Sequence, residues 1–587
     1  MIPLTDEQRE AVRYQGNLTL TACPGSGKTR VILAKLLNLA EQVIDTPRSI
    51  ACITYTNAAV DEIEHRLNRY GDHRIRDRSE VATIHSFCLQ YILRPYVWLV
   101  PDVPPHFSIL TQQMGVFERI VEAVEDEFNR PIQRSTFDDY GSLRANIEGN
   151  PTGNGIESGV ATDASARRYW EICRNRGFID FSMILFFSLR ILRENPFVGV
   201  GLASRFQWLL IDEFQDTTDV QVEILRHLAQ HNRSGFFLVG DENQSIQGFA
   251  GARPDLAIAF SGDVGARQDI GLTGNFRSSS RVVELAERSI ARVPAMIAIG
   301  ETADFSVEPK YVHSPTALEA VTDHFLPLLA EHNIDLGRAA VLAPWWQHLI
   351  PVARALRGFD VPVFGPGARP YKRSRLFAVL AEQLGACAET DHFLGVPGVE
   401  RALFHLVSES TGSTRFDIFT YEGRRTVMLL IYEARRLSQL NIGGEGWLRA
   451  MATASTQILI NEGWLPQQTM TLLTNSVDDM VGDMERQGVD VANLQVTDLG
   501  LFADPDNALK LLTMHRAKGR EFDAVALIHM NEGQMPHFSA RQTHEIDEGR
   551  RLFYVGVTRA QRLLMISSND SNFKNPPSRF LRECGLV

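Results

Sequence analysis

The chain has 587 residues, which is too long for one hydrophobic core, so we expect two to four domains. Its net charge of -12 excludes a protein coated in basic charge, and any nucleic-acid contact must be a local groove. Six cysteines without a C-x-x-C pair disfavour zinc ribbons, iron-sulfur clusters and disulfide frameworks. The first residues lack a basic leader, and no apolar run reaches membrane-spanning length. We therefore expect a cytoplasmic protein without membrane contact.

A phosphate-binding loop is predicted near the start of the chain. The β-prone run 18–21 precedes the loop 22–29, Ala-Cys-Pro-Gly-Ser-Gly-Lys-Thr, and an amphipathic helix should run from Thr29 to about Ala40. Glycines let backbone N–H groups face phosphates, Lys28 reaches the β and γ phosphates, and the Thr29 hydroxyl ligates Mg²⁺. The alternative is a chance glycine-rich turn before a surface helix. We expect an ATP site here.

Two further runs, 50–55 and 236–240, should join the same parallel sheet. Between them, residues 93–177 have the character of a mainly helical insertion, and Gly, Asn and Pro make 149–155 the best candidate for a flexible loop. The apolar run 208–211 delivers Asp212 and Glu213 at its carboxyl end, where open α/β sheets bind ligands. Asp212 would hold Mg²⁺ and Glu213 would act as general base, unless this is only a solvated acidic loop.

A second set of strands, 340–343, 524–528 and 563–566, predicts another doubly wound α/β domain. Trp345 and Trp346 follow the first of these strands, and core packing is the default expectation for them. Residues 386–498 have the character of a second helical insertion. Arg559 lies in a Tyr-Val-Gly-Val-Thr-Arg-Ala segment and is a second candidate phosphate contact, far from the first loop in the chain.

Taken together, these segments resemble the UvrD, Rep and PcrA family of superfamily 1A DNA helicases over about two-thirds of the chain. The resemblance implies two RecA-like P-loop NTPase domains of the α/β class, with parallel sheets flanked by helices and two mainly helical insertion subdomains. The implied boundaries are 1–92 with 178–280 for motor domain 1A, 93–177 for insertion 1B, 281–385 with 499–587 for motor domain 2A, and 386–498 for insertion 2B.

The resemblance also assigns nucleotide contacts to named residues. Gln8 would read adenine, Phe276 would cover the base opposite Arg30, and Glu521 would meet the ribose. Gln244 and Arg277 would touch the γ-phosphate, with Arg277, Glu521 and Arg559 coming from the second motor half. The expected ATP contacts are Gln8, Ala22, Gly25, Ser26, Gly27, Lys28, Thr29, Arg30, Phe276 and Glu521, with Thr29 and Asp212 at Mg²⁺. The expected catalytic residues are Lys28, Asp212, Glu213, Gln244, Arg277 and Arg559.

Single-stranded DNA contacts are implied for six residues, Tyr55, Asn57, His85, Phe249, Thr513 and His515. Hydroxyls and amides can grip phosphates, and aromatic faces stack on bases for about 1–3 kcal/mol each. For Tyr55 and His85 taken singly, ordinary packing is an equal alternative. Gln247 stands where the family usually has tyrosine, and Ala250 where it usually has arginine.

The resulting expectation is an ATP-dependent helicase that moves on single-stranded or partly duplex DNA, with 3′ to 5′ travel inherited from the resemblance. The alternative is a DNA-sensing ATPase subunit of a nuclease-containing complex, for example an antiphage system such as Gabija, with little unwinding of its own. A nuclease would then be its partner. A degenerate scaffold without turnover is a third alternative, disfavoured because the nucleotide-site residues are all present.

Overall fold

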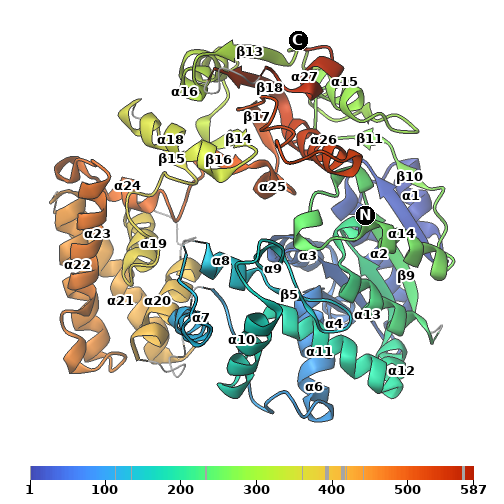
Figure 1. Ribbon diagram of the computed structural model, residues 1–587, viewed down its shortest axis with the longest axis horizontal. Helices are drawn as coiled ribbons and strands as arrows, with labels where there is room; N and C mark the ends of the chain where they lie inside the picture. Colours follow the sequence, from blue (N-terminus) through green and yellow to red (C-terminus); the bar gives the residue numbers. More distant parts are fainter. Residues whose placement is uncertain are drawn as a thin grey trace. The chain divides into compact units, whose positions relative to one another are not determined.

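The computed structural model divides into two compact units, and each is described by itself (Figure 1). It describes residues 2–112, 114–133, 135–231, 234–359, 361–389, 396–411, 417, 419–440, 442–570 and 576–587. Unit 1 comprises Met1–Val307 and Ala540–Thr558, and unit 2 comprises Glu308–Ser539 and Arg559–Val587.

Unit 1 is built on a parallel six-stranded sheet in the order β10-β1-β9-β8-β2-β3. The strands are β1 (Leu18–Ala22), β2 (Ser49–Thr54), β3 (Ser79–Thr83), β8 (Phe206–Ile211), β9 (Gly235–Gly240) and β10 (Gly271–Leu272). The four predicted strands are confirmed, and they are buried because helices cover both faces of a parallel sheet. The carboxyl ends of β1, β9 and β8 therefore meet at one edge of the sheet.

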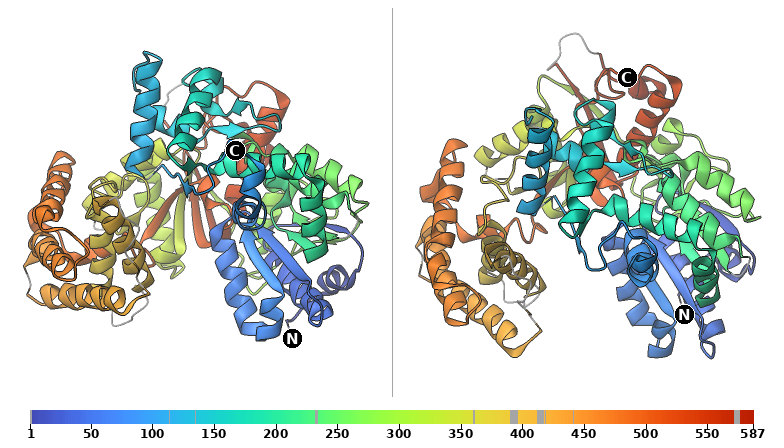
Figure 2. Two further views of the ribbon diagram at one scale, coloured as in Figure 1. Left: turned by 90° about the horizontal axis from the view of Figure 1, so that it is seen from below. Right: turned by 60° about the horizontal axis from the view of Figure 1, so that its bottom comes forward.

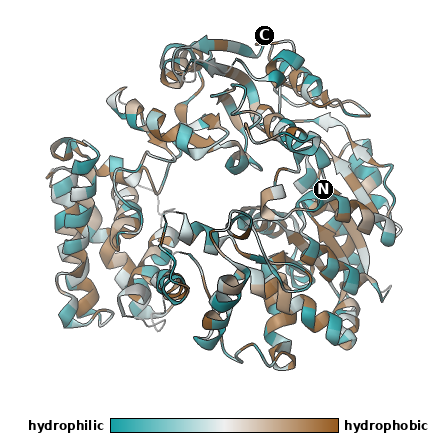
Figure 3. Cartoon of the chain, in the orientation of Figure 1, coloured by the Kyte–Doolittle hydropathy of each residue, from teal (hydrophilic) through white to brown (hydrophobic). Residues whose placement is uncertain are grey.

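Two hydrophobic clusters hold the helices of unit 1 against this sheet. One cluster contains α2 (Lys28–Val43), α1 (Asp6–Arg13) and α3 (Asn57–Tyr70), and the other contains α11 (Phe181–Glu194), α12 (Pro196–Arg205), α13 (Asp219–Ala229) and α14 (Pro254–Asp263). Helix α2 begins one residue before the predicted start and ends three residues beyond the predicted end. Figure 3 shows the amphipathic pattern of such helices as alternating hydrophobic and hydrophilic stretches.

The region 93–177 is mainly helical, as predicted, with α7 (Gly115–Glu127), α8 (Thr136–Gly141) and α10 (Asp163–Asn175). It shares one continuous core with the sheet of unit 1. The flexible-loop candidate 149–155 was expected to form neither helix nor strand, and this was wrong, because β6 (Pro151–Thr152) pairs antiparallel with β5 (Arg144–Ala145) and α9 (Asn154–Glu157) follows. Proline is tolerated there because β6 pairs on one side only, as an edge strand can.

Unit 2 contains a second parallel six-stranded sheet, in the order β13-β18-β17-β14-β16-β15. Its strands are β13 (Lys310–Ser314), β14 (Ala339–Ala343), β15 (Val363–Phe364), β16 (Leu509–Thr513), β17 (Phe522–Leu527) and β18 (Ala560–Asn569). The three predicted strands are confirmed, and the α/β class with two parallel sheets holds. The expectation of core packing was wrong for the indoles after β14, since Trp345 and Trp346 are 39% and 50% exposed.

The region of the second predicted insertion is helical (Figure 2), and its helices share a hydrophobic core of their own. The helices are α19 (Ala378–Glu389), which begins before the predicted start at 386, α20 (Val396–Thr411), α21 (Tyr421–Ser438), α22 (Gly443–Asn461), α23 (Leu472–Arg486) and α24 (Val496–Gly500). Trp447 lies fully buried at its centre and donates its indole N–H to the Ala434 carbonyl at 3.1 Å. A separate core is what an independently packed subdomain requires.

The compact units do not follow the predicted motor boundaries. Residues 281–307 and 540–558 were assigned to motor domain 2A but belong to unit 1. The reason is a set of contacts that join these segments to the first sheet region. Strand β11 (Gly274–Asn275) pairs with β12 (Ile297–Ala298), and α15 (Ser280–Ser289) packs on α26 (Thr543–Val557). The boundaries of the two insertions remain predictions.

Candidate nucleotide and nucleic-acid sites

The loop between β1 and α2 has the backbone of a phosphate cradle. Gly25 and Gly27 have φ angles of 68° and 80°, a left-handed region that glycine adopts without steric cost. A Cβ atom at Gly25 would lie 2.6 Å from the Arg277 Cβ, so only glycine fits. Ser26 Oγ is buried and has no hydrogen-bond partner among the described residues. Open backbone and an orphaned hydroxyl fit a bound phosphate.

Lys28 opens α2 and lies among the carboxylates that follow β8 and β9. Its Nζ is 3.4 Å from Glu213 Oε1. Burial by itself lowers the pKa of Lys28, but the Glu213, Asp241 and Asp212 carboxylates outweigh it and raise that pKa above its usual value. The lysine therefore stays charged, as a phosphate-binding cation must.

Asp212 and Glu213 lie directly after β8, as predicted. Burial, followed by the charge of Glu213, raises the pKa of Asp212 to about 7. Glu213 adopts a left-handed conformation with φ of 49°, which is uncommon for a residue with a side chain and occurs often at functional sites. Gln215 Nε2 donates to Glu213 Oε2 at 2.5 Å and so orients the proposed general base.

The predicted adenine end of the site is assembled in unit 1. The Arg30 guanidinium lies 5.3 Å from the centroid of the Phe276 ring, so the two partners expected to clamp a flat base already face each other. Gln8 is buried beside the loop and donates its amide to the Ser26 carbonyl at 2.9 Å. Its carbonyl oxygen accepts from the Thr5 N–H at 3.1 Å.

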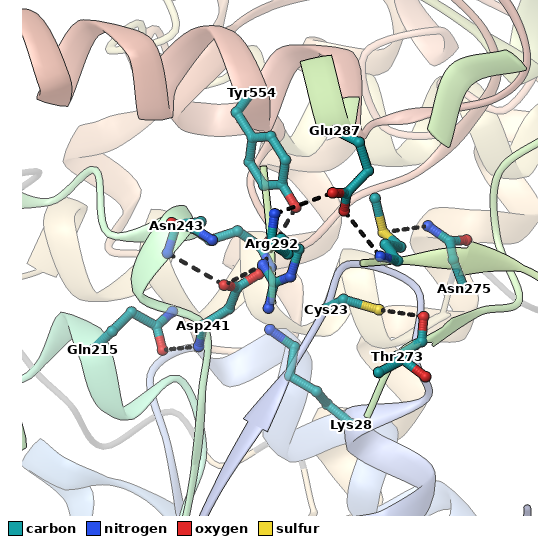
Figure 4. Close-up of polar contacts among 12 residues, drawn as sticks. Cys23, Lys28, Gln215, Asp241, Asn243, Thr273, Asn275, Glu287, Arg292 and Tyr554 are labelled. Atoms are coloured by element: carbon teal, nitrogen blue, oxygen red, sulfur yellow. Dashed lines mark hydrogen bonds and ion pairs between the residues drawn. The ribbon is translucent and has the colours of Figure 1, made fainter. Parts of the chain in front are cut away.

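Gln244 ends a short 3₁₀ turn after β9 and belongs to a polar network. Its Nε2 donates to Asp241 Oδ2 at 2.7 Å, and Arg292 Nη1 donates to Asp241 Oδ1 at 2.8 Å, a pair that Figure 4 shows. The Asp241 N–H donates to Gln215 Oε1 at 3.0 Å, which joins this network to Glu213. Asp241 begins the loop 241–249 after β9, here called the coupling loop, and the sequence assigned this aspartate no role. No sequence signal pointed to Arg292.

Arg277 was expected to act from the second motor half, although the implied boundary at residue 280 assigns it to motor domain 1A, and the structure places it in unit 1 with the phosphate loop. The Phe276 N–H donates to the Gly25 carbonyl at 2.8 Å, and the Arg277 N–H donates to Asn275 Oδ1 at 2.7 Å. Its Nη1 donates to the Thr558 carbonyl at 3.4 Å. A loop-to-loop contact that sequence periodicity does not reveal therefore fixes this arginine.

Glu521 and Arg559 belong to unit 2, as expected for residues of the second half. Arg559 is almost fully buried, and its Nη1 donates to the Arg520 carbonyl at 3.1 Å. Its own carbonyl accepts from the Phe522 N–H at 3.0 Å. Glu521 is exposed just before β17. Their roles at the nucleotide stay predictions.

A pocket of about 310 Å³ in unit 1 gathers the predicted DNA contacts Tyr55, Asn57 and His85. The remaining lining residues are Thr56, Thr83, Ser86, Leu89, Ile109, Phe181 and Ile184. The Phe181 ring, which the sequence analysis missed, is 50% exposed and meets His85 edge to face at 5.5 Å. A sequence signal for Phe181 was available, because Asp180 is a typical helix N-cap residue. The residue after it is then the first of α11 and lies at the surface. Two rings around an open pocket suit an unstacked base.

Phe249, another predicted DNA contact, is 50% exposed. Its carbonyl accepts from Arg144 Nη1 at 2.7 Å, and Arg144 comes from β5 of the helical insertion. Burial lowers the pKa of Arg144, and this side chain makes no ion pair with any residue that the structure describes. The charges of Glu157 and Asp219 raise that pKa but do not outweigh burial, so this arginine is only partly compensated and fits a phosphate ligand. No pattern in the sequence marks Arg144 as a site residue.

Thr513 and His515 lie at the carboxyl end of β16 in unit 2. Thr513 Oγ1 accepts from the Arg516 N–H at 3.3 Å and caps α25 (Met514–Ala517). Burial lowers the pKa of His515 to about 4, so this imidazole is neutral at physiological pH. A neutral ring and a hydroxyl can contact a strand without adding charge.

The comparisons with known proteins agree with this arrangement. The sequence model of the UvrD/REP helicase N-terminal domain matches residues 4–265, and that of the UvrD-like helicase C-terminal domain matches residues 486–571. The chain belongs to the UvrD/Rep/PcrA family of superfamily 1A helicases.

Relatives of this UvrD-like helicase extend over nearly its whole length. The ATP-dependent DNA helicase Rep of Escherichia coli is 25% identical, over 99% of this chain and 94% of its own. DNA helicase II of Haemophilus influenzae is 26% identical, over 99% of this chain and 86% of its own. ATP-dependent DNA helicase PcrA of Staphylococcus epidermidis is 23% identical, over 99% of this chain and 86% of its own.

The donor set of this helicase fits a nucleotide-bound metal better than a preformed metal cage. Within the described ranges, no group of three or more His, Cys, Asp or Glu side chains could hold a metal ion. Asp212 and Thr29 offer the carboxylate and hydroxyl that Mg²⁺ takes alongside phosphate oxygens and water. In the described part of the chain, no helix has both the length and the apolar character to cross a membrane.

Proposed function

We propose that this protein is an ATP-driven translocase and helicase that moves on single-stranded DNA. The observation that carries the proposal is the nucleotide site of unit 1, where Lys28 lies 3.4 Å from Glu213 at the edge of a parallel sheet. The Arg30 and Phe276 clamp and the base-sized pocket at His85 and Phe181 belong to the same unit. One compact unit thus offers both an ATP site and a strand site.

In this mechanism the chain's own residues bind ATP, orient the catalytic groups and polarise the attacking water. Lys28 and the loop N–H groups hold the phosphates, and Arg30 and Phe276 hold the base. Mg²⁺, held by Asp212 and Thr29, would screen the charge of the phosphates. Glu213, oriented by Gln215, would accept the proton of the attacking water while Gln244 and Arg277 contact the γ-phosphate.

The proposal is tested by ATP hydrolysis of the purified chain with and without single-stranded DNA. We expect strong stimulation by DNA, and the basal and the stimulated rate should both fall sharply in Glu213→Gln, which keeps the shape of the base and removes its basicity. Lys28→Ala should abolish turnover, since the loop loses its cation. Normal hydrolysis by Lys28→Ala would refute the assignment of the ATP site.

Travel from 3′ to 5′ is the direction that the family resemblance implies, and we include it in the proposal. Partial duplexes with either a 3′ or a 5′ single-stranded tail separate the two directions. We expect ATP-dependent strand separation only with the 3′ tail. Unwinding from the 5′ tail would overturn the direction and leave the ATPase assignment intact.

A second candidate keeps the DNA-dependent ATPase but removes autonomous unwinding, as in a sensing subunit of a nuclease-containing complex. It is favoured by Gln247 and Ala250, which replace the tyrosine and arginine usual in the family next to Phe249. Stimulated hydrolysis without unwinding of either tailed duplex, together with copurification of a nuclease from the native host, would select it. Unwinding by the chain alone would exclude it.

A further inference from the structure

Arg292 lies in the segment that follows α15 and reaches into the nucleotide site of unit 1 (Figure 4). Its side chain is 8% exposed and forms an ion pair of 2.8 Å with Asp241, whose side chain is 1% exposed. A buried arginine is costly to desolvate, and its contacts have to be specific to hold it there. The pair is therefore a built feature of this site rather than a surface contact.

The partner carboxylate orients the residue proposed to contact the γ-phosphate. Asp241 Oδ2 accepts from Gln244 Nε2 at 2.7 Å while Oδ1 accepts from Arg292. Oδ1 also accepts from the Asn243 N–H at 3.2 Å, so the guanidinium makes the shorter of the two contacts to that oxygen. If the guanidinium were removed, only the longer Asn243 contact would hold Oδ1, and the Gln244 amide would have a less firmly fixed acceptor.

The charge balance around Lys28 gives a second reason for this arginine. Lys28 Nζ lies 3.4 Å from Glu213 Oε1, and the Asp241 carboxylate faces the same lysine (Figure 4). A triphosphate has to compete with these carboxylates for the lysine. Because Arg292 neutralises Asp241 at 2.8 Å, that competition is reduced at the carboxylate beside the coupling loop.

Arg292 is itself held from two sides. Its N–H and that of Met296 donate to the two oxygens of Glu287, both at 3.0 Å, which fixes the segment after α15. Its Nη1 also lies 3.4 Å from the Tyr554 hydroxyl on α26. The guanidinium therefore joins the coupling loop after β9 to the helix whose chain continues into Arg559.

We propose that Arg292 is a positioning residue for ATP hydrolysis, which fixes the Asp241 carboxylate and, through it, the Gln244 amide at the γ-phosphate. The inference rests on the proposed ATPase function. It adds a residue that acts through Asp241 without touching the nucleotide. Its effect belongs to the hydrolysis step and not to the affinity for ADP, which lacks the γ-phosphate.

The test is a double-mutant cycle of Arg292→Met and Gln244→Ala in the full chain, with DNA-stimulated kcat, KM for ATP and ADP affinity as readouts. Arg292→Lys is the conservative variant, because it keeps the charge. Arg226→Met is the matched control, since Arg226 makes an ion pair of 3.0 Å with Asp263 on the surface of the same unit. Affinity for ADP with aluminium fluoride, which mimics the transferring phosphoryl group, provides a readout that needs no turnover.

We expect Arg292→Met to lower kcat roughly 10- to 100-fold, the effect of misplacing a catalytic group by about 1 Å, with ADP affinity within threefold of wild type. The double variant should be no slower than Gln244→Ala, because both changes disrupt the same arrangement, the Gln244 amide held by Asp241. Arg292→Lys should recover most of the rate, and Arg226→Met should match wild type. Affinity for ADP with aluminium fluoride should fall in Arg292→Met.

Three results would overturn the inference. One is an unchanged kcat in Arg292→Met, and another is a double variant whose loss equals the product of the single losses. The third is a loss of ADP affinity and thermal stability as large as the loss of kcat, without recovery in Arg292→Lys, which would mark a merely structural arginine. Absence of turnover in the wild-type chain would instead refute the proposed function, and the aluminium fluoride affinities would still decide the role of Arg292.

Discussion

The phosphate loop allows the steric cost of one methyl group to be separated from its conformational cost. Alanine at Gly25 would keep a left-handed φ of 68° and place its Cβ 2.6 Å from the Arg277 Cβ and 2.7 Å from Asn275 Oδ1. Alanine at Gly265 would keep a similar φ of 60°, with no heavy atom of the described residues within 4 Å. The pair therefore shares the backbone cost and differs in the collision.

The magnitudes follow from these distances. A left-handed alanine costs about 1–2 kcal/mol, and this is the whole effect expected for Gly265→Ala. Carbon atoms prefer separations of about 3.5–4.0 Å, so Gly25→Ala must displace the Arg277 segment by about 1 Å. Overpacking adds roughly 1–3 kcal/mol of destabilisation. A displacement of about 1 Å at a γ-phosphate ligand can lower turnover roughly 100-fold.

Urea unfolding and DNA-stimulated ATP hydrolysis of both variants check this reasoning. Gly265→Ala should lose a little stability and keep wild-type kcat, whereas Gly25→Ala should lose more stability and nearly all turnover. If the two variants unfolded alike and hydrolysed ATP alike, the close approach of Gly25 and Arg277 could not be what shapes the site.

Three further predictions concern the DNA contacts and their pH dependence. Phe181→Ala should weaken oligo-dT binding in fluorescence anisotropy by about 1–3 kcal/mol, the worth of one stacked base, and unchanged binding would exclude stacking there. Arg144→Met should make the slope of log affinity against log salt shallower by about 0.7, the share of one phosphate on a single strand, while the ion-paired Arg168→Met should leave it unchanged. Burial lowers the pKa of His85 from 6.5 to about 4, so between these values only the unfolded chain binds the proton and acidification destabilises the fold. Between pH 7 and 5 urea unfolding should show a loss of about 2 kcal/mol from this residue, and His85→Gln should lose that much less.

The parts of the fold that could be predicted from sequence are those with local signals. Buried parallel strands have continuous apolar runs in the sequence, and the glycine-rich loop lies between such a strand and a helix. The runs at 18–21, 208–211 and 340–343 therefore predicted β1, β8 and β14 correctly. The short edge strands β10 and β15 have two residues each and carry no such signal.

The missed residues depend on contacts between distant parts of the chain. Arg292 meets Asp241 across 51 positions, and Arg144 meets the Phe249 carbonyl across 105. Neither arginine lies in a periodic segment that would mark it. The prediction for Trp345 was wrong for a related reason. An aromatic residue after a buried strand can pack in the core or lie at the surface, and the sequence alone does not distinguish the two. In the structure the Trp345 ring is partly exposed and contacts the His537 ring edge to face at 5.2 Å.

The grouping of Arg277 with the phosphate loop changes how its role can be isolated. Lys28, Glu213, Gln244 and Arg277 all belong to unit 1, so γ-phosphate contacts from this set need no movement of unit 2. Glu521 and Arg559, in contrast, belong to unit 2. Substitutions in the first set should therefore affect basal and DNA-stimulated hydrolysis in the same proportion, because they remove groups that are present in either condition. A step that DNA accelerates has to involve residues outside this set, and comparing the two rates for each variant distinguishes the groups that perform hydrolysis from those that couple it to the strand.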